Sequence, residues 1–72
     1  MNLFQQHYES DLKLADRYEK RGYALMAKAV AGTERYCQLR REAGGYFRRA
    51  KNHRRNAELI RVSRCINGVW QE

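Results

Sequence analysis

No proline interrupts the 72 residues of this chain, so its five glycines are the residues best able to end a helix. Ala, Leu, Arg, Lys, Glu and Gln are abundant, and these side chains lose little rotamer freedom in a helical turn. The composition therefore predicts an all-α fold. We expect residues 1–72 to form one domain with a small core, because a chain of this length can bury little apolar surface.

Apolar residues recur at helical spacing in three segments that glycines separate. These segments cover residues 3–20, 23–43 and 46–66. We expect tight turns at Gly22 and at the pair Gly44 and Gly45, since glycine readily adopts the conformation that closes a helix. Gly32 offers a further break within the second segment. The sequence thus predicts a small bundle of three main helices joined by tight glycine turns.

The periodic apolar residues are the candidates for the core. The first segment contributes Phe4, Tyr8, Leu12, Ala15 and Tyr18. The second contributes Tyr23, Met26, Ala27, Val30, Tyr36, Leu39 and Ala43. The third contributes Tyr46, Ala50, His53, Ala57 and Ile60, widened by Leu59, Val62, Ile66 and Val69. At the ends, we expect Asn2 to cap the first helix, Thr33 to cap a helix after Gly32, and a turn at Asn67 and Gly68 to return Trp70 to the bundle.

The segment EKRGYALMAK at residues 19–28 is echoed by EAGGYFRRAK at residues 42–51. Each copy places an aromatic residue after a glycine and an alanine five positions beyond that glycine, an arrangement that suits a helix hairpin. We interpret the pair as one hairpin turn used twice. Leu25 and Met26 of the first copy become Arg48 and Arg49 in the second. This contrast marks the last helix as the part that meets a partner.

The net charge of +7 lies in the second half of the chain. Residues 33–64 carry ten basic and three acidic side chains, whereas residues 1–32 carry five and four. The positive electrostatic potential of these residues favours association with a polyanion or with an acidic protein surface.

The last predicted helix concentrates this charge. Its candidate binding residues are Arg48, Arg49, Lys51, Asn52, Arg54, Arg55, Arg61 and Arg64. Between residues 46 and 64 only Glu58 opposes them. Arginine grips phosphate and carboxylate groups bidentately, and asparagine can bind base edges. The pattern fits DNA, RNA or an acidic protein groove.

Other classes of function find little support in the sequence. No set of residues resembles a catalytic triad or a phosphate loop, so we expect neither an enzyme nor a cofactor. Cys37 and Cys65 lie outside any CxxC pair, with His7 and His53 as the available histidines, and we expect both cysteines to be buried small groups and no metal to be bound. The lack of a long apolar run predicts no membrane contact and a cytoplasmic location.

One further pattern covers about a third of the chain. It consists of Glu42, Gly45, Phe47, Arg48, Arg49 and Ala50, followed by Arg61, Arg64 and Cys65. This pattern resembles that of the PerC-like and ANR groups of small regulators from enteric bacteria and their mobile elements. The resemblance implies a small helical modulator of transcription that acts at DNA, or by binding a larger activator or a nucleoid protein.

Two hypotheses for function follow. The first is a non-enzymatic regulator whose basic last helix engages nucleic acid or a transcription complex. The alternative is a phage- or plasmid-encoded inhibitor or adaptor that uses the same arginines to bind a host or defence protein. Dimerisation through the aromatic first helix is a separate expectation.

Overall fold

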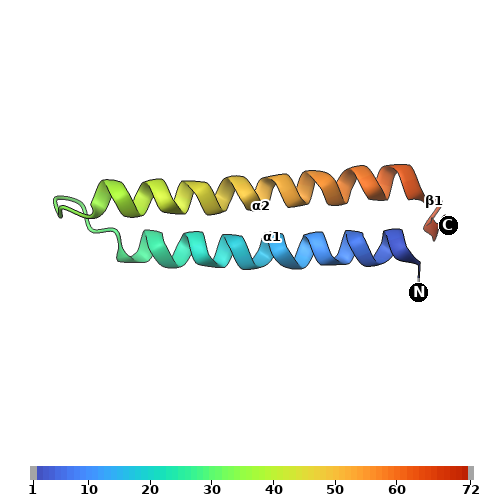
Figure 1. Ribbon diagram of the computed structural model, residues 1–72, viewed down its shortest axis with the longest axis horizontal. Helices are drawn as coiled ribbons and strands as arrows, with labels where there is room; N and C mark the ends of the chain where they lie inside the picture. The colour runs from blue at the N-terminus through green and yellow to red at the C-terminus, as the bar shows by residue number, and fades with distance from the viewer. Residues whose placement is uncertain (1, 72) are drawn as a thin grey trace.

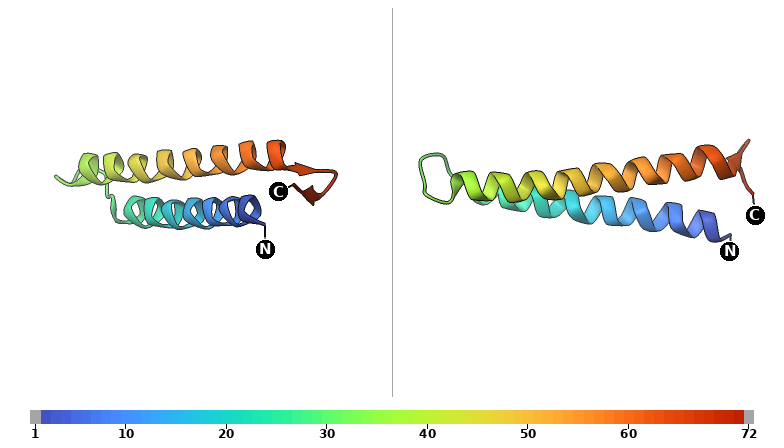
Figure 2. Two further views of the ribbon diagram at one scale, coloured as in Figure 1. Left: turned by 45° about the vertical axis from the view of Figure 1, so that its right-hand side comes forward. Right: turned by 45° about the horizontal axis from the view of Figure 1, so that its top comes forward.

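Two long antiparallel helices make up most of the computed structural model, which describes residues 2–71 (Figure 1). Helix α1 spans Leu3–Lys28 and helix α2 spans Tyr36–Arg64. The short strands β1, Cys65–Ile66, and β2, Val69–Trp70, pair antiparallel after α2. The hairpin measures 52 × 17 × 15 Å, with the interhelical loop at one end and the β-strands at the other (Figure 2).

The prediction of three main helices is wrong, because α1 continues through Gly22 and α2 continues through Gly44 and Gly45. Gly22 is buried against α2, and a Cβ added there would lie 2.7 Å from Cε1 of Phe47. This glycine therefore permits close helix packing and does not form a turn. Gly44 and Gly45 are tolerated inside α2, where each costs about 1 kcal/mol relative to alanine.

The helices are connected near Gly32, the residue at which the sequence offered a further break. Gly32 has φ of 88°, a left-handed conformation that favours glycine. The amide of Thr33 donates to the carbonyl of Val30 at 3.2 Å and tightens the loop. Thr33 does not cap α2, since the N-cap position belongs to Arg35 and lacks a side-chain hydrogen bond.

The helices meet along a seam whose positions alternate at three and four residues, the heptad spacing of a coiled coil. In α1 the seam contains Phe4, Tyr8, Asp11, Ala15, Tyr18, Gly22 and Leu25. In α2 it contains Tyr36, Leu39, Ala43, Tyr46, Ala50, His53, Ala57 and Ile60. Its most buried members are small, namely Ala15, Gly22, Ala43, Ala50 and Ala57. Such residues let the two backbones approach closely, at the cost of a thin core.

The internal repeat does not produce two hairpin turns, because both copies lie within helices. The copies are 23 residues apart, which does not match a whole number of 3.5-residue steps along a coiled coil. Equivalent residues therefore face different ways. Gly22 lies in the seam whereas Gly45 is only partly buried, and Ala50 is buried whereas Ala27 is exposed.

The N-terminal cap is confirmed. The Asn2 side-chain oxygen accepts hydrogen bonds from the amides of Phe4 and Gln5, at 2.8 and 3.2 Å. The Asn2 side-chain nitrogen donates to the carbonyl of Gln71 at 2.9 Å. One side chain therefore caps α1 and ties the two ends of the described chain together.

The predicted turn after α2 is also confirmed. Asn67 and Gly68 have φ of 53° and 79°, the pair of left-handed residues that a two-residue hairpin favours. The turn folds Trp70 back so that its ring centroid lies 5.2 Å from that of Tyr8. Trp70 thus covers the open end of the helix pair.

Several residues expected in the core are exposed. Among them are Tyr23, Val30, Leu59, Val62, Ile66 and Val69, each more than half exposed. A third helix would have covered such side chains, but two helices bury only one stripe each. Cys37 is likewise exposed and Cys65 half-buried, both with free thiols. Within residues 2–71, no helix is both long and apolar enough to cross a membrane.

Alanine should have opposite effects on stability at Gly44, which has space around it, and at Gly22, which packs against Phe47. Gly44→Ala should raise the free energy of unfolding by about 1 kcal/mol, because its nearest neighbour is the Arg48 side chain at 3.8 Å. Gly22→Ala should lower it by about 1 kcal/mol, since displacing the Phe47 ring outweighs the gain in helix propensity. Urea unfolding followed by circular dichroism measures both. In a chain that also carries Phe47→Ala, Gly22→Ala should become stabilising. If Gly22→Ala stabilises the parent chain, Gly22 is not needed for packing against Phe47.

Candidate nucleic-acid interface

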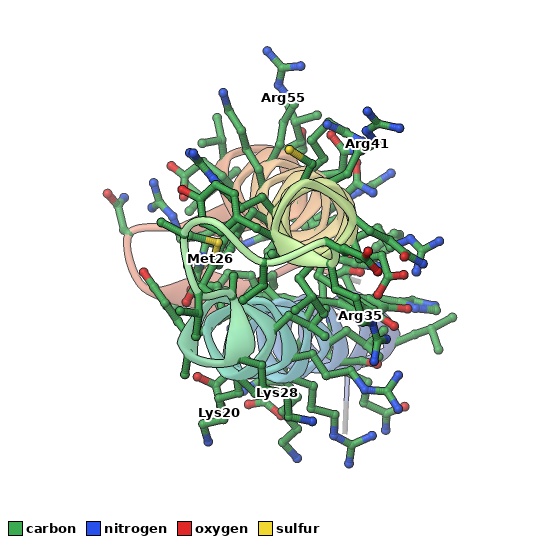
Figure 3. The ribbon with its side chains drawn as sticks, turned by 90° about the vertical axis from the view of Figure 1, so that its left-hand side faces the viewer. Lys20, Met26, Lys28, Arg35, Arg41 and Arg55 are labelled. Carbon is green, nitrogen blue, oxygen red and sulfur yellow. The ribbon has the colours of Figure 1, made fainter. Side chains whose placement is uncertain are left out.

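Four basic residues form a row along the side of α2 that faces away from α1. They are Arg41, Arg48, Lys51 and Arg55, and we call this row the outer face of α2. Their spacing of seven, three and four residues places them on one side of the helix, opposite the seam. All four are exposed, and Figure 3 shows Arg41 and Arg55 projecting away from α1. Within residues 2–71, no carboxylate forms an ion pair with any of them.

The corresponding side of α1 carries charges of both signs. Its residues are Glu9, Lys13, Asp16 and Lys20, at helical spacing. Nζ of Lys20 lies 2.9 Å from Oδ2 of Asp16, and Lys20 projects away from α2 (Figure 3). The outer side of α1 is therefore close to neutral, whereas the row on α2 is basic from Arg41 to Arg55 and is followed by Glu58, which pairs with Arg61.

Two of the predicted binding arginines are already paired with carboxylates. Arg54 forms a bidentate pair with Glu19 of α1, with Nη2 2.7 Å from Oε2. Arg61 pairs with Glu58 within α2, with Nε 3.0 Å from Oε2. Hydrogen bonds from these arginines hold the pKa of Glu19 and of Glu58 below the usual value of 4.5. Arg54 and Arg61 are thus less available to a partner than their exposure suggests.

Two more predicted arginines lie against aromatic rings. The guanidinium carbon of Arg49 is 5.9 Å from the ring centroid of Tyr18 and 5.5 Å from that of Tyr46. The guanidinium carbon of Arg64 is 4.2 Å from the ring centroid of Phe4. All three are cation–π distances. Arg48, Lys51, Asn52 and Arg55 are the predicted site residues that the structure leaves together on one exposed surface.

Arg41 belongs to the outer face but was missed from sequence. It lies seven residues before Arg48, so the heptad spacing of the row would have included it. The prediction that a helix ends at Gly44 and Gly45 separated Arg41 from the residues that follow. Because α2 continues through both glycines, Arg41 and Arg55 stand on the same helix.

A polar pair interrupts the seam. Nδ1 of His53 lies 2.9 Å from Oδ1 of Asp11, and the two side chains are only 28% and 20% exposed. The carboxylate accepts, so the imidazole nitrogen donates. Polar pairs in a coiled-coil seam penalise other alignments of the helices. This pair therefore favours the observed alignment of α2 on α1.

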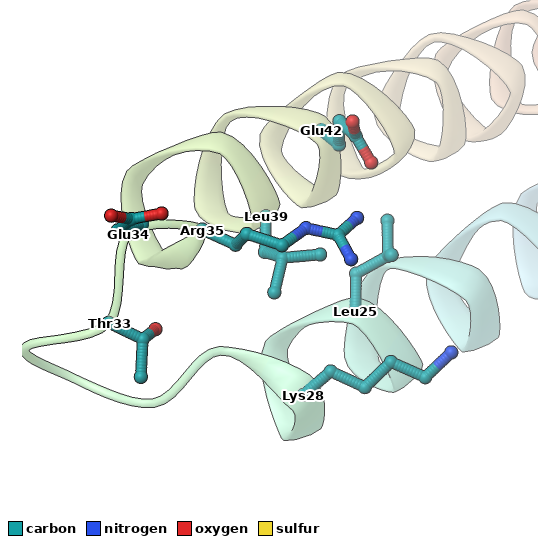
Figure 4. A pocket seen from close by; sticks show the side chains of 7 residues that line it. All are labelled: Leu25, Lys28, Thr33, Glu34, Arg35, Leu39 and Glu42. Atoms are coloured by element: carbon teal, nitrogen blue, oxygen red, sulfur yellow. The ribbon is translucent and has the colours of Figure 1, made fainter.

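A shallow hollow of about 460 Å³ opens beside the interhelical loop (Figure 4). It is lined by Leu25, Lys28, Thr33, Glu34, Arg35, Leu39 and Glu42. Two basic and two acidic side chains surround its leucines, so the hollow does not select ligands of one charge. Within residues 2–71, no group of histidine, cysteine and acidic residues could hold a metal ion.

No protein-family model, curated protein or solved structure matches the chain. The surface chemistry is therefore the basis for a functional proposal. Its main feature is the contrast between the four unpaired basic residues of the outer face of α2 and the nearly neutral outer side of α1.

The Glu19 pair predicts a pH-dependent component of stability. Because the folded-state pKa of Glu19 is depressed, the pair stabilises the hairpin above the unfolded carboxyl value of 4.5 and loses this effect as pH falls through the lower folded value. Glu19→Gln should therefore lower the melting temperature at pH 7, and its difference from the parent should vanish at strongly acidic pH. Glu9→Gln, on the outer side of α1, is the matched control. A Glu19→Gln difference that persists at pH 2 would contradict the pairing.

Proposed function

We propose that this chain is a small non-enzymatic regulator that binds nucleic acid through the outer face of α2. The proposal is based on the row of Arg41, Arg48, Lys51 and Arg55. None of these side chains forms an ion pair with a carboxylate among the described residues. The row spans 14 helical steps, or about 21 Å. That length suits several successive phosphates of one strand or the two edges of a groove.

The shape of the hairpin is compatible with this use. An α-helix with its side chains is about 10–12 Å across, close to the width of the major groove of DNA at about 12 Å. Helix α1 packs on the opposite side of α2 and leaves the outer face open along its length (Figures 1 and 3). Asn52 lies at the edge of this face, where an amide could reach a base edge while the arginines bind phosphates.

A merely solvated surface explains the row less well. Exposed helices usually mix charges of opposite sign, which gains pair interactions and solubility. The outer side of α1 follows this rule, with Asp16 and Lys20 paired, whereas the outer face of α2 departs from it. The regulatory part of the proposal rests on the resemblance of residues 42–65 to the PerC-like and ANR regulators.

A second candidate function has support at the end of α2. Leu59 and Val62 follow Arg55 on the same side of the helix and are 59% and 62% exposed. Ile66 and Val69, a cross-strand pair, are also exposed. Phosphates do not need these apolar groups, but a protein partner with acidic and apolar side chains would cover them. An inhibitor or adaptor that binds such a protein is therefore the alternative.

The outer face predicts strongly salt-dependent binding. Fluorescence anisotropy with a labelled DNA duplex and an RNA strand at low salt should detect binding at micromolar protein, weakening as salt rises. On the duplex, the double variant Arg48→Gln/Arg55→Gln should lower the affinity about tenfold and reduce the slope of log K against log salt by about 1.8, since each lost phosphate contact contributes about 0.9.

The matched control is Lys13→Gln/Lys20→Gln, which removes the same charge from the outer side of α1 and should change the affinity less than about twofold. Equal effects of the two double variants would mean that net charge, and not the outer face, governs binding. Absence of binding to either nucleic acid would favour the protein-binding alternative, for which Leu59→Ser/Val62→Ser should abolish capture of the partner.

A further inference from the structure

A second group of arginines lies on one flank of the hairpin and comes from both helices. It consists of Arg17 and Arg21 of α1 and Arg49 of α2, all exposed. Arg49 and Arg54 are five residues apart, so they stand on opposite flanks of α2. On the flank of Arg54, Glu19 balances the charge. On the flank of Arg49, none of the three arginines forms an ion pair within the part of the chain that the structure describes.

Planar side chains from the two helices stack beneath two of these arginines, Arg21 and Arg49. Tyr18 stacks with His53, with ring centroids 5.6 Å apart, and with Tyr46, with ring centroids 6.1 Å apart. The guanidinium carbons of Arg21 and Arg49 lie 5.6 and 5.5 Å from the centroid of Tyr46. The rings already stack with protein groups, so the flank offers no free platform for a base. What it offers is guanidinium N–H groups held by the rings.

Asp11 reaches this stack through His53 and is paired with it, so Glu42 is the carboxylate near the group that forms no ion pair among the described residues. Glu42 lines a hollow of about 240 Å³ together with Tyr46 and Arg49, and it accepts a hydrogen bond from the Gln38 amide at 3.3 Å. Three guanidinium groups against one carboxylate leave the flank basic. Guanidinium groups restrained by aromatic rings lose less freedom when they bind an anion.

The flank is continuous with the outer face of α2. Arg48 on the outer face and Arg49 on the flank are consecutive residues, about 100° apart around the helix. The surface between them carries the uncharged residues Asn52 and Asn56. A strand that crosses α2 at this turn would therefore pass from the outer face onto the flank without meeting a carboxylate.

We infer that Arg17, Arg21 and Arg49 bind backbone phosphates of the same nucleic acid, so that its footprint extends from α2 onto α1. This inference rests on the proposed function and specifies the contact as phosphate and not base stacking. Because the cluster includes residues of both helices, a ligand bound there holds the hairpin closed and stabilises it against unfolding.

The test compares variants of α1 by anisotropy with the same labelled DNA duplex. Arg17→Gln/Arg21→Gln should weaken binding about tenfold and lower the salt slope by about 1.8. Lys13→Gln, which removes one charge from the outer side of the same helix, is the control for Arg17→Gln and should change affinity less than about twofold. If loss of Arg21 loosens the hairpin, as circular dichroism would show, Arg17→Gln alone leaves the stack intact and should lower the slope by about 0.9.

The outcomes separate the two proposals. If the parent chain binds and Arg17→Gln behaves like Lys13→Gln, the flank takes no part and the inference is wrong, while the outer face of α2 stands as the site. If the parent chain binds neither DNA nor RNA, both proposals fail. Glu42→Gln should have the opposite effect on affinity, since removing the carboxylate beside Arg49 should strengthen binding.

Discussion

Close packing of small residues along the heptad seam is the interaction on which the whole structure depends. Ala15 and Ala43 are fully buried, and Ala50 and Ala57 are 1% exposed. Small side chains at these positions let two helices associate along their length without a third element. Each helix contributes only one narrow stripe of side chains to this contact, so most of its surface faces solvent.

Because the core is thin, specific polar contacts complement it. The pair of Asp11 and His53 penalises misalignment of the seam, and Glu19 with Arg54 joins the helices on one flank. At the open end, Asn2 hydrogen-bonds to Gln71. None of these contacts involves Arg41, Arg48, Lys51 or Arg55, so the outer face of α2 is left exposed.

The helical class, the Asn2 cap and the turn at Asn67 and Gly68 could be predicted from sequence, because each depends on residues close together in the chain. The role of Gly22 could not be predicted. A glycine that closes a helix and one that admits a neighbouring side chain look alike locally, and the side chain that decides between them, Phe47, lies 25 residues away.

The same distinction applies to the candidate site. Arg48, Lys51 and Arg55 are three and four residues apart, so helical spacing alone is enough to place them on one face. The pairing of Arg61 with Glu58 could also be predicted from sequence, since the two are three residues apart in one helix. The pairing of Arg54 with Glu19 required the register of the two helices, which the sequence pattern does not reveal when the number of helices is misjudged.

Binding through the outer face of α2 can be tested by two-dimensional NMR of the arginine Nε–Hε groups during titration with a DNA duplex at low salt. The outer face of α2 predicts that the Arg41, Arg48 and Arg55 signals shift most. The signals of Arg54 and Arg61, which are paired with carboxylates, should move little. Dominant shifts of Arg54 and Arg61, with the outer-face signals unchanged, would contradict it.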